Sequence, residues 1–431
     1  MRKLITYIIL FFSFFLYSQE PLFTLVDNSK TGIDFSNDLV DTKEHSIFLY
    51  ANYYGGAGVG IGDFDNDGLE DIFFAANLVD DKIYKNLGNF QFEDKTKMSG
   101  IINNGSWSTG VTVADVNNDG LLDIYVSCEL YDDLPYLRTN KLYINEGDFK
   151  FKESAKNWGV DVDRRTRHSV FFDYNNDGLL DLYLLNHPPN TGNFSPFFGS
   201  DMTLPEYNLQ LFENKGDHFI DVTQSAGLDR SGFPNAAVIG DFNKDGWPDI
   251  YVANDFDAPD FLYYNNKDGS FTYKTESSLR HTSFYSMGVD AADINNDSHL
   301  DLMVLDMTAE DNFRLKSNMS AMNPESFWKV VNGGGHYQYM FNTMQINNGN
   351  DTFSDIAQLT GTAATDWSWS SLVADFDNDG NKDIYITNGL LRDIRNTDAD
   401  KKIAEIVSKK INDYLTNNLN DSEISLWDVV D

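Results

Sequence analysis

Six acidic loops of nine residues carry the chemistry that this sequence can perform. Their shared pattern is Asp-x-(Asp/Asn)-x-Asp-Gly-x-x-Asp, with Ser298 replacing the glycine in the fifth copy. Oxygen side chains at alternate positions, a tight turn and a closing carboxylate suit a hard cation, above all Ca²⁺. Positions 1, 3, 5 and 9 supply the candidate ligands, which are Asp63, Asp65, Asp67 and Asp71; Asp115, Asn117, Asp119 and Asp123; Asp173, Asn175, Asp177 and Asp181; Asp241, Asn243, Asp245 and Asp249; Asp293, Asn295, Asp297 and Asp301; Asp375, Asp377, Asp379 and Asp383.

The spacing within each loop predicts how an ion is held. Position 6 must turn sharply, and glycine reaches positive φ without a steric clash. We expect position 7 to offer its carbonyl and the aspartate at position 9 to close the cage. An EF-hand closes with glutamate at position 12 between two helices, so these loops are not EF-hands. A single copy could merely cap a turn through its own backbone, whereas six copies in one phase, each followed by a strand, favour metal binding.

The number of carboxylates predicts how the six sites differ in affinity. The first and sixth loops hold four carboxylates and the others three, so we expect the first and sixth to bind Ca²⁺ most tightly. The fifth loop should be the weakest, because a serine at positive φ costs roughly 1 kcal/mol. The sequence therefore predicts up to six Ca²⁺ sites of unequal affinity.

The loops sit inside a repeat of four short strands. A strand rich in small residues, such as Gly58–Gly62, precedes the loop, and an apolar strand follows it. A third strand ends in asparagine before a polar turn, as in Leu142–Gly147, and a fourth runs from phenylalanine to glycine, as in Phe151–Gly159. Four antiparallel strands in each repeat of 52 to 82 residues describe a β-propeller blade. The predicted fold is an all-β propeller of four-stranded antiparallel blades with six loops.

The two ends of the chain predict further segments. Residues 1–18, with Arg2 and Lys3 before an apolar run, are typical of a secretory signal peptide, the alternative being an uncleaved anchor. Residues 19–395 form the propeller, and Phe23–Gly32 resembles a fourth strand that completes the last blade. Residues 396–431 are predicted to be a helical insertion that starts an incomplete blade, because apolar residues recur with a helical period over 401–418. We expect the protein to continue into further C-terminal domains.

Charge and cysteine content exclude several classes. The formal charge of −35 disfavours nucleic acid and anionic membranes as partners. Cys128 is the only cysteine, so no internal disulfide can form. No nucleophile elbow, phosphate loop or zinc-spaced histidine pair is present. His168, His187 and His281 lie near loops and could serve as general acids or bases, but hydrogen-bonded structural roles are the simpler interpretation. Counting acidic residues alone does not exclude a catalytic pair of carboxylates of the glycosidase kind.

The repeat resembles the FG-GAP (VCBS) repeats of integrin-α-type propellers. More narrowly, it resembles the cartilage-acidic-protein-like family of long secreted bacterial proteins. The stretches that carry the narrower resemblance include residues 55–68, Met287–Asn295, Asp306–Asn312 and Asp366–Trp369. The resemblance implies a calcium-stabilised, seven-bladed propeller that is secreted or lies at the cell surface. Integrin function does not follow from it.

Two insertions are the expected places for ligand binding, because loops on a rigid scaffold often carry function. They span His187–Asn208 and Asp306–Asn342 and are rich in aromatic residues, which could stack on sugars or pack as a small satellite core. We expect a binding or adhesion module for carbohydrate or a cell-surface protein. The alternatives are a propeller-based polysaccharide lyase or hydrolase, and a purely structural domain. A deep central cleft with Arg, His or Lys beside carboxylates would favour an enzyme, and catalysis is not the main expectation.

Overall fold

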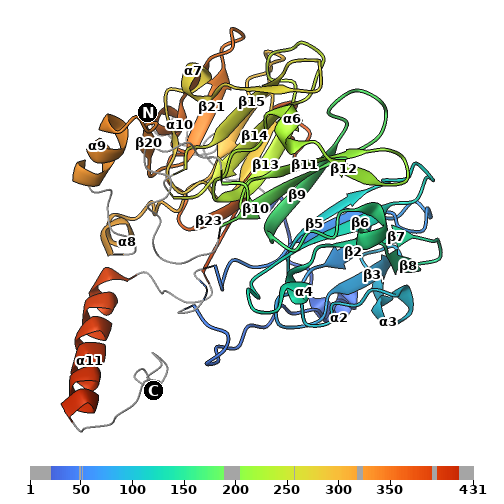
Figure 1. The fold of residues 1–431 in the computed structure, drawn as a ribbon, viewed down its shortest axis with the longest axis horizontal. Coiled ribbons are helices and arrows are strands. Elements are labelled where there is room, and N and C mark those ends of the chain that lie inside the picture. The colour runs from blue at the N-terminus through green and yellow to red at the C-terminus, as the bar shows by residue number, and fades with distance from the viewer. Residues whose placement is uncertain are drawn as a thin grey trace, which may run out of the picture.

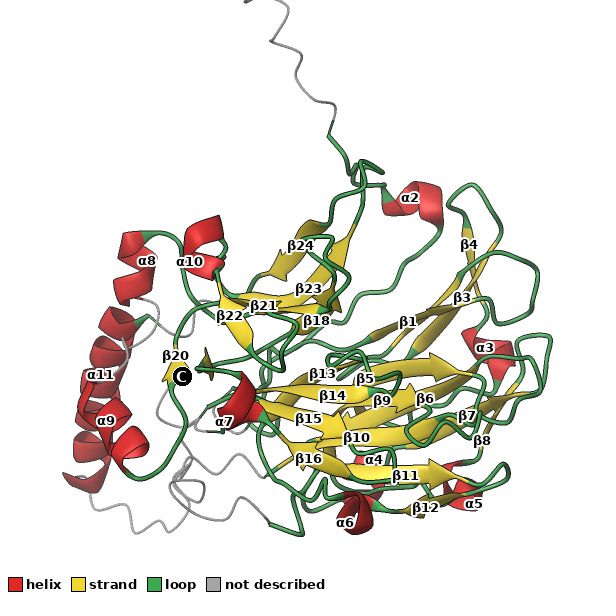
Figure 2. Cartoon of the chain, turned by 90° about the horizontal axis from the view of Figure 1, so that it is seen from above, coloured by secondary structure: helices red, strands yellow, loops and turns green. Residues whose placement is uncertain are grey.

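The computed structural model describes residues 21–47, 50, 52–188, 204–256, 258–317, 324–390 and 396–416. Within this part of the chain, strands form successive antiparallel sheets that fan around a common centre (Figures 1 and 2). The inner strands of consecutive sheets lie side by side in chain order. This is the predicted β-propeller. The predicted signal peptide over residues 1–18 lies outside the described residues.

The six sheets are called blades one to six, and the strands of each blade follow one another from the inside outward. Blade one holds β1 (Val59–Gly62), β2 (Asp71–Phe74), β3 (Lys82–Asn86) and β4 (Phe92–Asp94); blade two holds β5 (Trp107–Ala114), β6 (Asp123–Glu129), β7 (Lys141–Asn145) and β8 (Phe151–Glu153); blade three holds β9 (Arg165–Phe172), β10 (Asp181–His187), β11 (Gln210–Asn214) and β12 (Phe219–Asp221). Blade four holds β13 (Pro234–Gly240), β14 (Asp249–Asn254), β15 (Phe261–Asn265) and β16 (Phe271–Tyr273); blade five holds β18 (Val289–Ala292), β19 (Asp301–Val304), β21 (Thr343–Asn347) and β22 (Phe353–Asp355); the described part of blade six holds β23 (Ser368–Ala374) and β24 (Asp383–Asn388).

The hydrophobic core lies between neighbouring blades. One cluster joins Phe73 and Ile83 of blade one to Ile124 and Val126 of blade two, and similar clusters follow between later blades. Small residues let the inner strands approach each other. A Cβ built on Gly110 of β5 would lie 2.8 Å from Cα of His168 in β9, closer than real Cβ contacts. The first strand of a blade therefore needs the small residues that the sequence showed there, because larger side chains would prevent the inner strands of neighbouring blades from coming into contact.

The sequence predicted that the fourth segment of each repeat is one long strand, and in blades one to five this prediction is wrong. The segment is a strand of three residues followed by a single helical turn. These helices are α3 (Thr96–Ser99), α5 (Ala155–Trp158), α6 (Thr223–Ala226), α7 (Thr275–Ser278) and α10 (Ala357–Thr360). Four of the five end at a left-handed glycine with φ between 70° and 80°, and α7 ends at Leu279 instead. The Phe-to-Gly spacing thus marks a strand plus a glycine-capped turn.

Two contacts recur between neighbouring blades and give the order of the ring. The residue at position 2 of a loop packs against the phenylalanine of the next outer strand, as Phe64 does on Phe151 with ring centroids 5.8 Å apart. The glycine after the helical turn lies against the backbone of that same phenylalanine, as Gly100 does on Phe151.

The N-terminal segment makes both of these contacts although it belongs to no described sheet. Phe23 packs against Phe376, position 2 of the sixth loop, with ring centroids 5.6 Å apart. Gly32, which ends α2 (Asn28–Thr31), lies against the backbone of Phe92 in blade one. The prediction of a strand over Phe23–Gly32 is wrong, because these residues form an extended segment and a helical turn. They occupy the outer edge of a seventh blade position, after blade six and before blade one.

Three helices outside the blades gather on one side of the molecule in both views (Figures 1 and 2). These are α8 (Asn312–Ser317), α9 (Pro324–Asn332) and α11 (Thr397–Thr416), while α4 (Pro135–Arg138) lies beside blade two. The parallel pair β17 (Thr282–Ser283) and β20 (Gln338–Tyr339) ties the insertion that carries α8 and α9 to the start of blade five. The helix α11 lies where the sequence predicted a helical period. No helix within the described ranges has the length and apolar character that a membrane crossing requires.

Candidate ion sites and the opposite face

All six acidic loops lie at the same end of the blades, because each joins the first strand of a blade to the second. Direct contacts between loops agree with this topology. Asn66 of the first loop donates to the Gly120 carbonyl of the second at 3.0 Å, and Asn296 of the fifth donates to the Gly380 carbonyl of the sixth at 3.3 Å. The connections between second and third strands, which include both predicted insertions, therefore emerge at the opposite end. We call these two ends the loop face and the insertion face.

The backbone of each loop turns through two left-handed residues. Position 6 has φ of 86° at Gly68 and 69° at Ser298, as the sequence predicted. Position 4 is left-handed as well, with φ of 57° at Asn66 and 58° at Lys244. Asparagine tolerates this conformation better than most residues, and five of the six loops have it at position 4. The second left-handed residue was not expected from the sequence, although the asparagine was the available signal.

The carboxylate at position 1 is oriented by the loop backbone. In the third loop, Asp173 accepts the N–H of Asp177 at 3.0 Å and that of Gly178 at 2.8 Å. Equivalent bonds occur in every loop, from Asp67 and Gly68 to Asp63 through to Asp379 and Gly380 to Asp375. The side chain at position 1 is thereby fixed before any ion arrives, which reduces the entropy that binding has to overcome.

The aspartate at position 9 is the most buried ligand candidate. Asp181 is fully buried and accepts the N–H of Tyr174 at 3.0 Å and that of Asn214 at 2.8 Å. Burial raises the pKa of Asp123, Asp181 and Asp249 to about 7, and that of Asp71 to about 6. The two backbone donors on each carboxylate lower the pKa but do not offset burial. These aspartates therefore lie where a bound cation would favour their charged form.

Carboxylates converge most closely in the first and sixth loops. Carboxylate oxygens of Asp63, Asp65 and Asp71 lie within 4.8 Å of one another, and so do those of Asp375, Asp377 and Asp383. The other four loops carry asparagine at position 3, so they bring fewer carboxylates together. In the first loop, Oδ1 of Asp65 is buried and has no hydrogen-bond partner in the described chain. Such an oxygen fits a cation ligand, so the residues present fit a hard ion.

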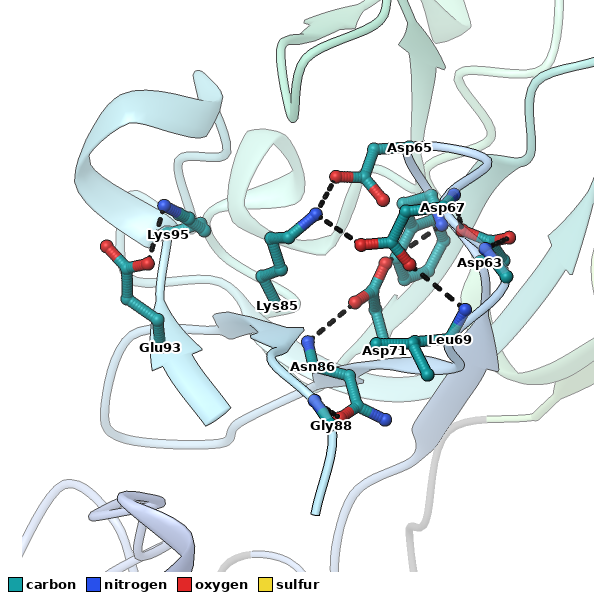
Figure 3. A network of polar contacts seen from close by, with 12 residues as sticks. Asp63, Asp65, Asp67, Leu69, Asp71, Lys85, Asn86, Gly88, Glu93 and Lys95 are labelled. Atoms are coloured by element: carbon teal, nitrogen blue, oxygen red, sulfur yellow. Dashed lines mark hydrogen bonds and ion pairs between the residues drawn. The ribbon is translucent and has the colours of Figure 1, made fainter. Parts of the chain in front are cut away.

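A lysine reaches the carboxylates of the first loop (Figure 3). The ammonium of Lys85, from β3, forms ion pairs with Asp65 and, at 2.7 Å, with Asp67. These two aspartates hold the pKa of Lys85 above its ordinary value, even though burial acts to lower it. The sequence pattern predicted no role for Lys85, which follows the last residue of its own loop by fourteen positions.

Other charged residues also reach the loops from the outer half of a blade. Asn175 of the third loop donates to Glu213 of β11 at 3.2 Å, and Glu213 pairs with Lys215 at 2.6 Å. Lys267 lies 3.4 Å from Asp245 of the fourth loop. The structure thus adds Lys85, Glu213 and Lys267 to the loop surroundings. Each sits on a third strand or on the turn after it, where the sequence pattern gives no sign of contact with a loop.

The insertion over Asp306–Asn342 carries aromatic residues in two different settings. Phe327 stacks on Tyr339 with centroids 5.5 Å apart, and Tyr339 stacks on Phe341 at 5.9 Å. Trp328 and Tyr337 also contact Phe327 but remain 52% and 41% exposed, and Phe313 is 72% exposed. We call Phe313, Trp328 and Tyr337 the exposed aromatic group. The satellite core and the exposed aromatics that the sequence offered as alternatives occur together. Most of the other insertion, over 189–203, lies outside the described residues.

The three histidines named from the sequence occupy different places and do not form one site. His187 is buried against Phe233, and burial lowers its pKa to about 3. His281 lies 3.5 Å from Asp355 and packs on Tyr339. His168 lines a cavity of about 410 Å³ on the propeller axis, together with Arg167 and Asp290. We call it the axial cavity. It has the central position, and the arginine and histidine beside a carboxylate, that the sequence analysis gave as features favouring an enzyme.

Comparisons with known proteins find several chains that this chain resembles at low sequence identity. The curated protein Cartilage acidic protein 1 from Homo sapiens is 25% identical over 308 residues, which cover 66% of this chain and 42% of that protein. The chain thus spans less than half of that relative. A lectin from Agrocybe aegerita, solved for its recognition of non-reducing terminal N-acetylglucosamine, is 18% identical with a TM-score of 0.42, covering 76% of this chain and 73% of the lectin. Trypanosoma rangeli sialidase is 10% identical with a TM-score of 0.37, covering 82% and 56%.

A protein-family model matches the repeat itself. The model described as FG-GAP-like repeat matches residues 37–126, 202–252, 241–304 and 330–386, which is more than half of the chain. The matched segments contain five of the six acidic loops, and the third lies between two of them. The chain belongs to the FG-GAP-like repeat proteins.

Proposed function

We propose that this chain is a calcium-stabilised propeller that acts outside the cell as a binding or adhesion module, for a polysaccharide or a cell-surface protein. The observation that carries the proposal is the separation of the two faces. Six loops of one geometry lie on the loop face, and the insertion that carries the exposed aromatic group lies on the insertion face. Ion sites on the first face hold neighbouring blades, which leaves the second face free to vary.

The role of the ion follows from the residues that surround it. The proposed ligands are the aspartates and asparagines at positions 1, 3, 5 and 9 of the loops. An ion there would supply positive charge beside buried carboxylates such as Asp181, whose neighbours in the loop are also acidic. Asn214 links this arrangement to the preceding loop, because it donates to the Val116 carbonyl at 2.8 Å. Ion binding therefore stabilises contacts between blades as well as one turn.

The exposed aromatic group is the proposed contact surface. Aromatic rings have apolar faces that suit sugar rings, and large exposed apolar side chains on one surface mark interaction sites. Extracellular action rests on the pattern of residues 1–18 and on Ca²⁺ being abundant outside cells. An entirely structural role is the main rival, since a scaffold would need the ions but not the exposed aromatics.

The enzyme alternative meets one specific obstacle in the axial cavity. A hydrolase of the usual kind needs two carboxylates beside the bond it cleaves, and Asp290 is the only carboxylate residue among the described residues that line the cavity. Both oxygens of Asp290 already accept a backbone N–H, from Ala291 at 2.8 Å and from Val373 at 2.7 Å. Binding is therefore the function that this geometry supports best.

Affinity electrophoresis through gels that contain different polysaccharides tests the proposal. We expect at least one polysaccharide to retard the calcium-loaded chain, and both chelation and Trp328→Ala to weaken the retardation. Lys97→Ala, at an exposed position on α3, is the control and should behave as the parent chain. Failure of every polysaccharide, together with failure to bind cell surfaces, would leave the structural role.

A further inference from the structure

The axial cavity is the feature that the proposed function leaves unused. It is lined by the inner strands of all six described blades, from Val59 in blade one to Leu372 in blade six, and its volume of about 410 Å³ is that of a small-molecule site. Several of its lining glycines serve contact between strands, as Gly110 does against His168. The small residues alone therefore do not indicate a ligand, and any recognition must come from the polar groups.

Arg167 is the only cationic residue among the described residues that line this cavity, in a protein of formal charge −35. Its side chain is 9% exposed and is held by Glu129, which is 1% exposed, through one bond of 2.7 Å from Nη1. Nε and Nη2 have no hydrogen-bond partner within the described chain. A guanidinium presents five N–H donors in a fork that matches a carboxylate, so Arg167 keeps donors available for a second anion.

The backbone near Arg167 leaves room for the guanidinium. Gly55 lines the same cavity, and a Cβ built on it would lie 2.5 Å from Nη2 of Arg167. Any side chain at this position would have to displace the guanidinium. Unlike Gly110, whose missing Cβ accommodates a neighbouring backbone, Gly55 accommodates the charged end of a side chain that lines the cavity.

The remaining polar lining suits hydroxyl groups. Burial, and then the charge of Arg167, lower the pKa of His168 to about 4, so its neutral ring offers one donor and one acceptor. Asn235 donates from Nδ2 to the Ser286 carbonyl at 3.0 Å and retains its Oδ1 acceptor. Asp290 accepts one backbone N–H on each oxygen, and each oxygen can accept a further bond. Mixed donors and acceptors of this kind pair with hydroxyls, which are both donor and acceptor.

We propose that the axial cavity binds a small hydroxylated carboxylate, of the class of a uronic acid residue, with Arg167 holding its carboxylate. The ring hydroxyls are held by His168, Asn235 and Asp290. This site is separate from the exposed aromatic group, so it adds a second place of contact to the proposed binding function. It would confer a preference for acidic over neutral sugars that stacking on aromatic rings cannot give.

Isothermal titration of the full calcium-loaded chain tests this assignment, with D-galacturonate and D-glucuronate as probes and galactose and glucose as neutral counterparts. We expect a uronate to bind and its neutral counterpart to bind at least tenfold more weakly. The double variant Arg167→Met with Glu129→Gln should lose at least tenfold in uronate affinity, and removing both charges avoids leaving one buried alone. Arg280→Met, at an exposed arginine that does not line the cavity, is the matched control and should bind as the parent chain.

A second variant keeps the test decisive if the double variant fails to fold. Ser370 lines the cavity and is exposed, so Ser370→Asp adds a negative charge with little risk to folding, and it should also weaken uronate binding at least tenfold. Trp328→Ala should leave uronate affinity unchanged, which separates this site from the proposed aromatic surface. Equal affinity for uronates and neutral sugars, absence of uronate binding to the folded parent chain, or parent-like affinity in Ser370→Asp would each overturn the assignment of a uronate to this cavity.

Discussion

The ammonium of Lys85 lies 2.7 Å from Oδ2 of Asp67 and also pairs with Asp65, so a side chain of β3 sits among the carboxylates of the first loop. Blades two to five have no cation at the equivalent position, the residue before the asparagine that ends the third strand; these residues are Ile144, Glu213, Tyr264 and Ile346. The first loop therefore has four carboxylates but an internal counter-charge. Carboxylate number alone does not set the order of affinities when a lysine competes with the ion.

Replacing this lysine should strengthen ion binding at the first loop. Lys85→Met removes a positive charge within bonding distance of two proposed ligands, and we expect Ca²⁺ affinity there to rise about tenfold. Calcium titration followed by native mass spectrometry would show one more ion retained at low calcium. Lys82→Met on the same strand is the control, because Lys82 pairs with Asp94 and not with the loop. An unchanged or lower affinity would show that Lys85 does not compete with the ion.

Removal of calcium should destabilise the whole propeller. Each site filled at about 0.1–1 mM would add about 1–2 kcal/mol in millimolar calcium, and several sites together approach the net stability of a domain. We expect excess chelator to lower the melting temperature by about 10 °C or more, measured by circular dichroism, and magnesium at the same concentration to restore less than half of the shift. A melting temperature that is unchanged by chelator, together with no calcium retained by the protein, would contradict the ion sites.

From the buried aspartates at position 9 we predict that the free energy of unfolding depends on pH in opposite directions with and without calcium. In the chelated protein, burial raises the pKa of Asp123, Asp181 and Asp249 to about 7. The folded state then binds more protons than the unfolded state between about pH 4 and 7, so the free energy of unfolding falls as pH rises through this window. The slope is up to about 1.4 kcal/mol per pH unit for each carboxylate.

With calcium bound, protons and the ion compete for the same carboxylates. Acidification from pH 7.5 to 5.5 should therefore stabilise the chelated protein and destabilise the calcium-loaded one. Urea unfolding at several pH values, with and without calcium, measures both slopes. Parallel slopes in the two series would mean that the aspartates at position 9 are not ligands.

The sequence predicted the local parts of this molecule well and the contacts between repeats poorly. The loops, the four-strand order and the inner strands were readable, because each depends on residues within one short segment. The outer segment was mistaken for one strand, since a glycine-capped turn such as α5 leaves no hydrophobic period. Lys85 and Glu213 reach a loop only through strand register, which no local pattern records. The position of Phe23–Gly32 beside the last blade was predicted from its likeness to the other outer segments, and Phe23 does pack against Phe376 of blade six. Binding of Ca²⁺ at the loops stays a prediction.

The fifth loop offers a test of backbone strain. Ser298 has φ of 69° at a position where the other loops have glycine, and Ser298→Gly should stabilise the protein by roughly 1 kcal/mol. The reverse change, Gly246→Ser in the fourth loop, should destabilise it by a similar amount, since a Cβ there meets no atom within 4 Å and only the backbone conformation resists. Urea unfolding in calcium measures both. Equal stability of both variants and the parent would show that serine is accommodated without strain.

A hydrogen bond between blades can be isolated by comparing two asparagines. Asn214 donates from Nδ2 to the Leu180 carbonyl of its own blade and to the Val116 carbonyl of the preceding loop. Asn86 makes the same bond within its blade, to the Glu70 carbonyl, and in the described chain it has no partner in a preceding loop. Both accept a turn N–H on Oδ1, from Gly216 and Gly88 respectively.

Asn214→Ala should therefore destabilise the protein more than Asn86→Ala, by about 1–3 kcal/mol, because it leaves the buried Val116 carbonyl without this donor. Urea unfolding of both variants in calcium gives the difference directly. Asn265→Ala, which removes the equivalent bond to the Tyr174 carbonyl, should match Asn214→Ala. If all three variants lose the same stability, the bond within the blade carries the effect, and the loops are coupled around the ring by packing and bound ions instead.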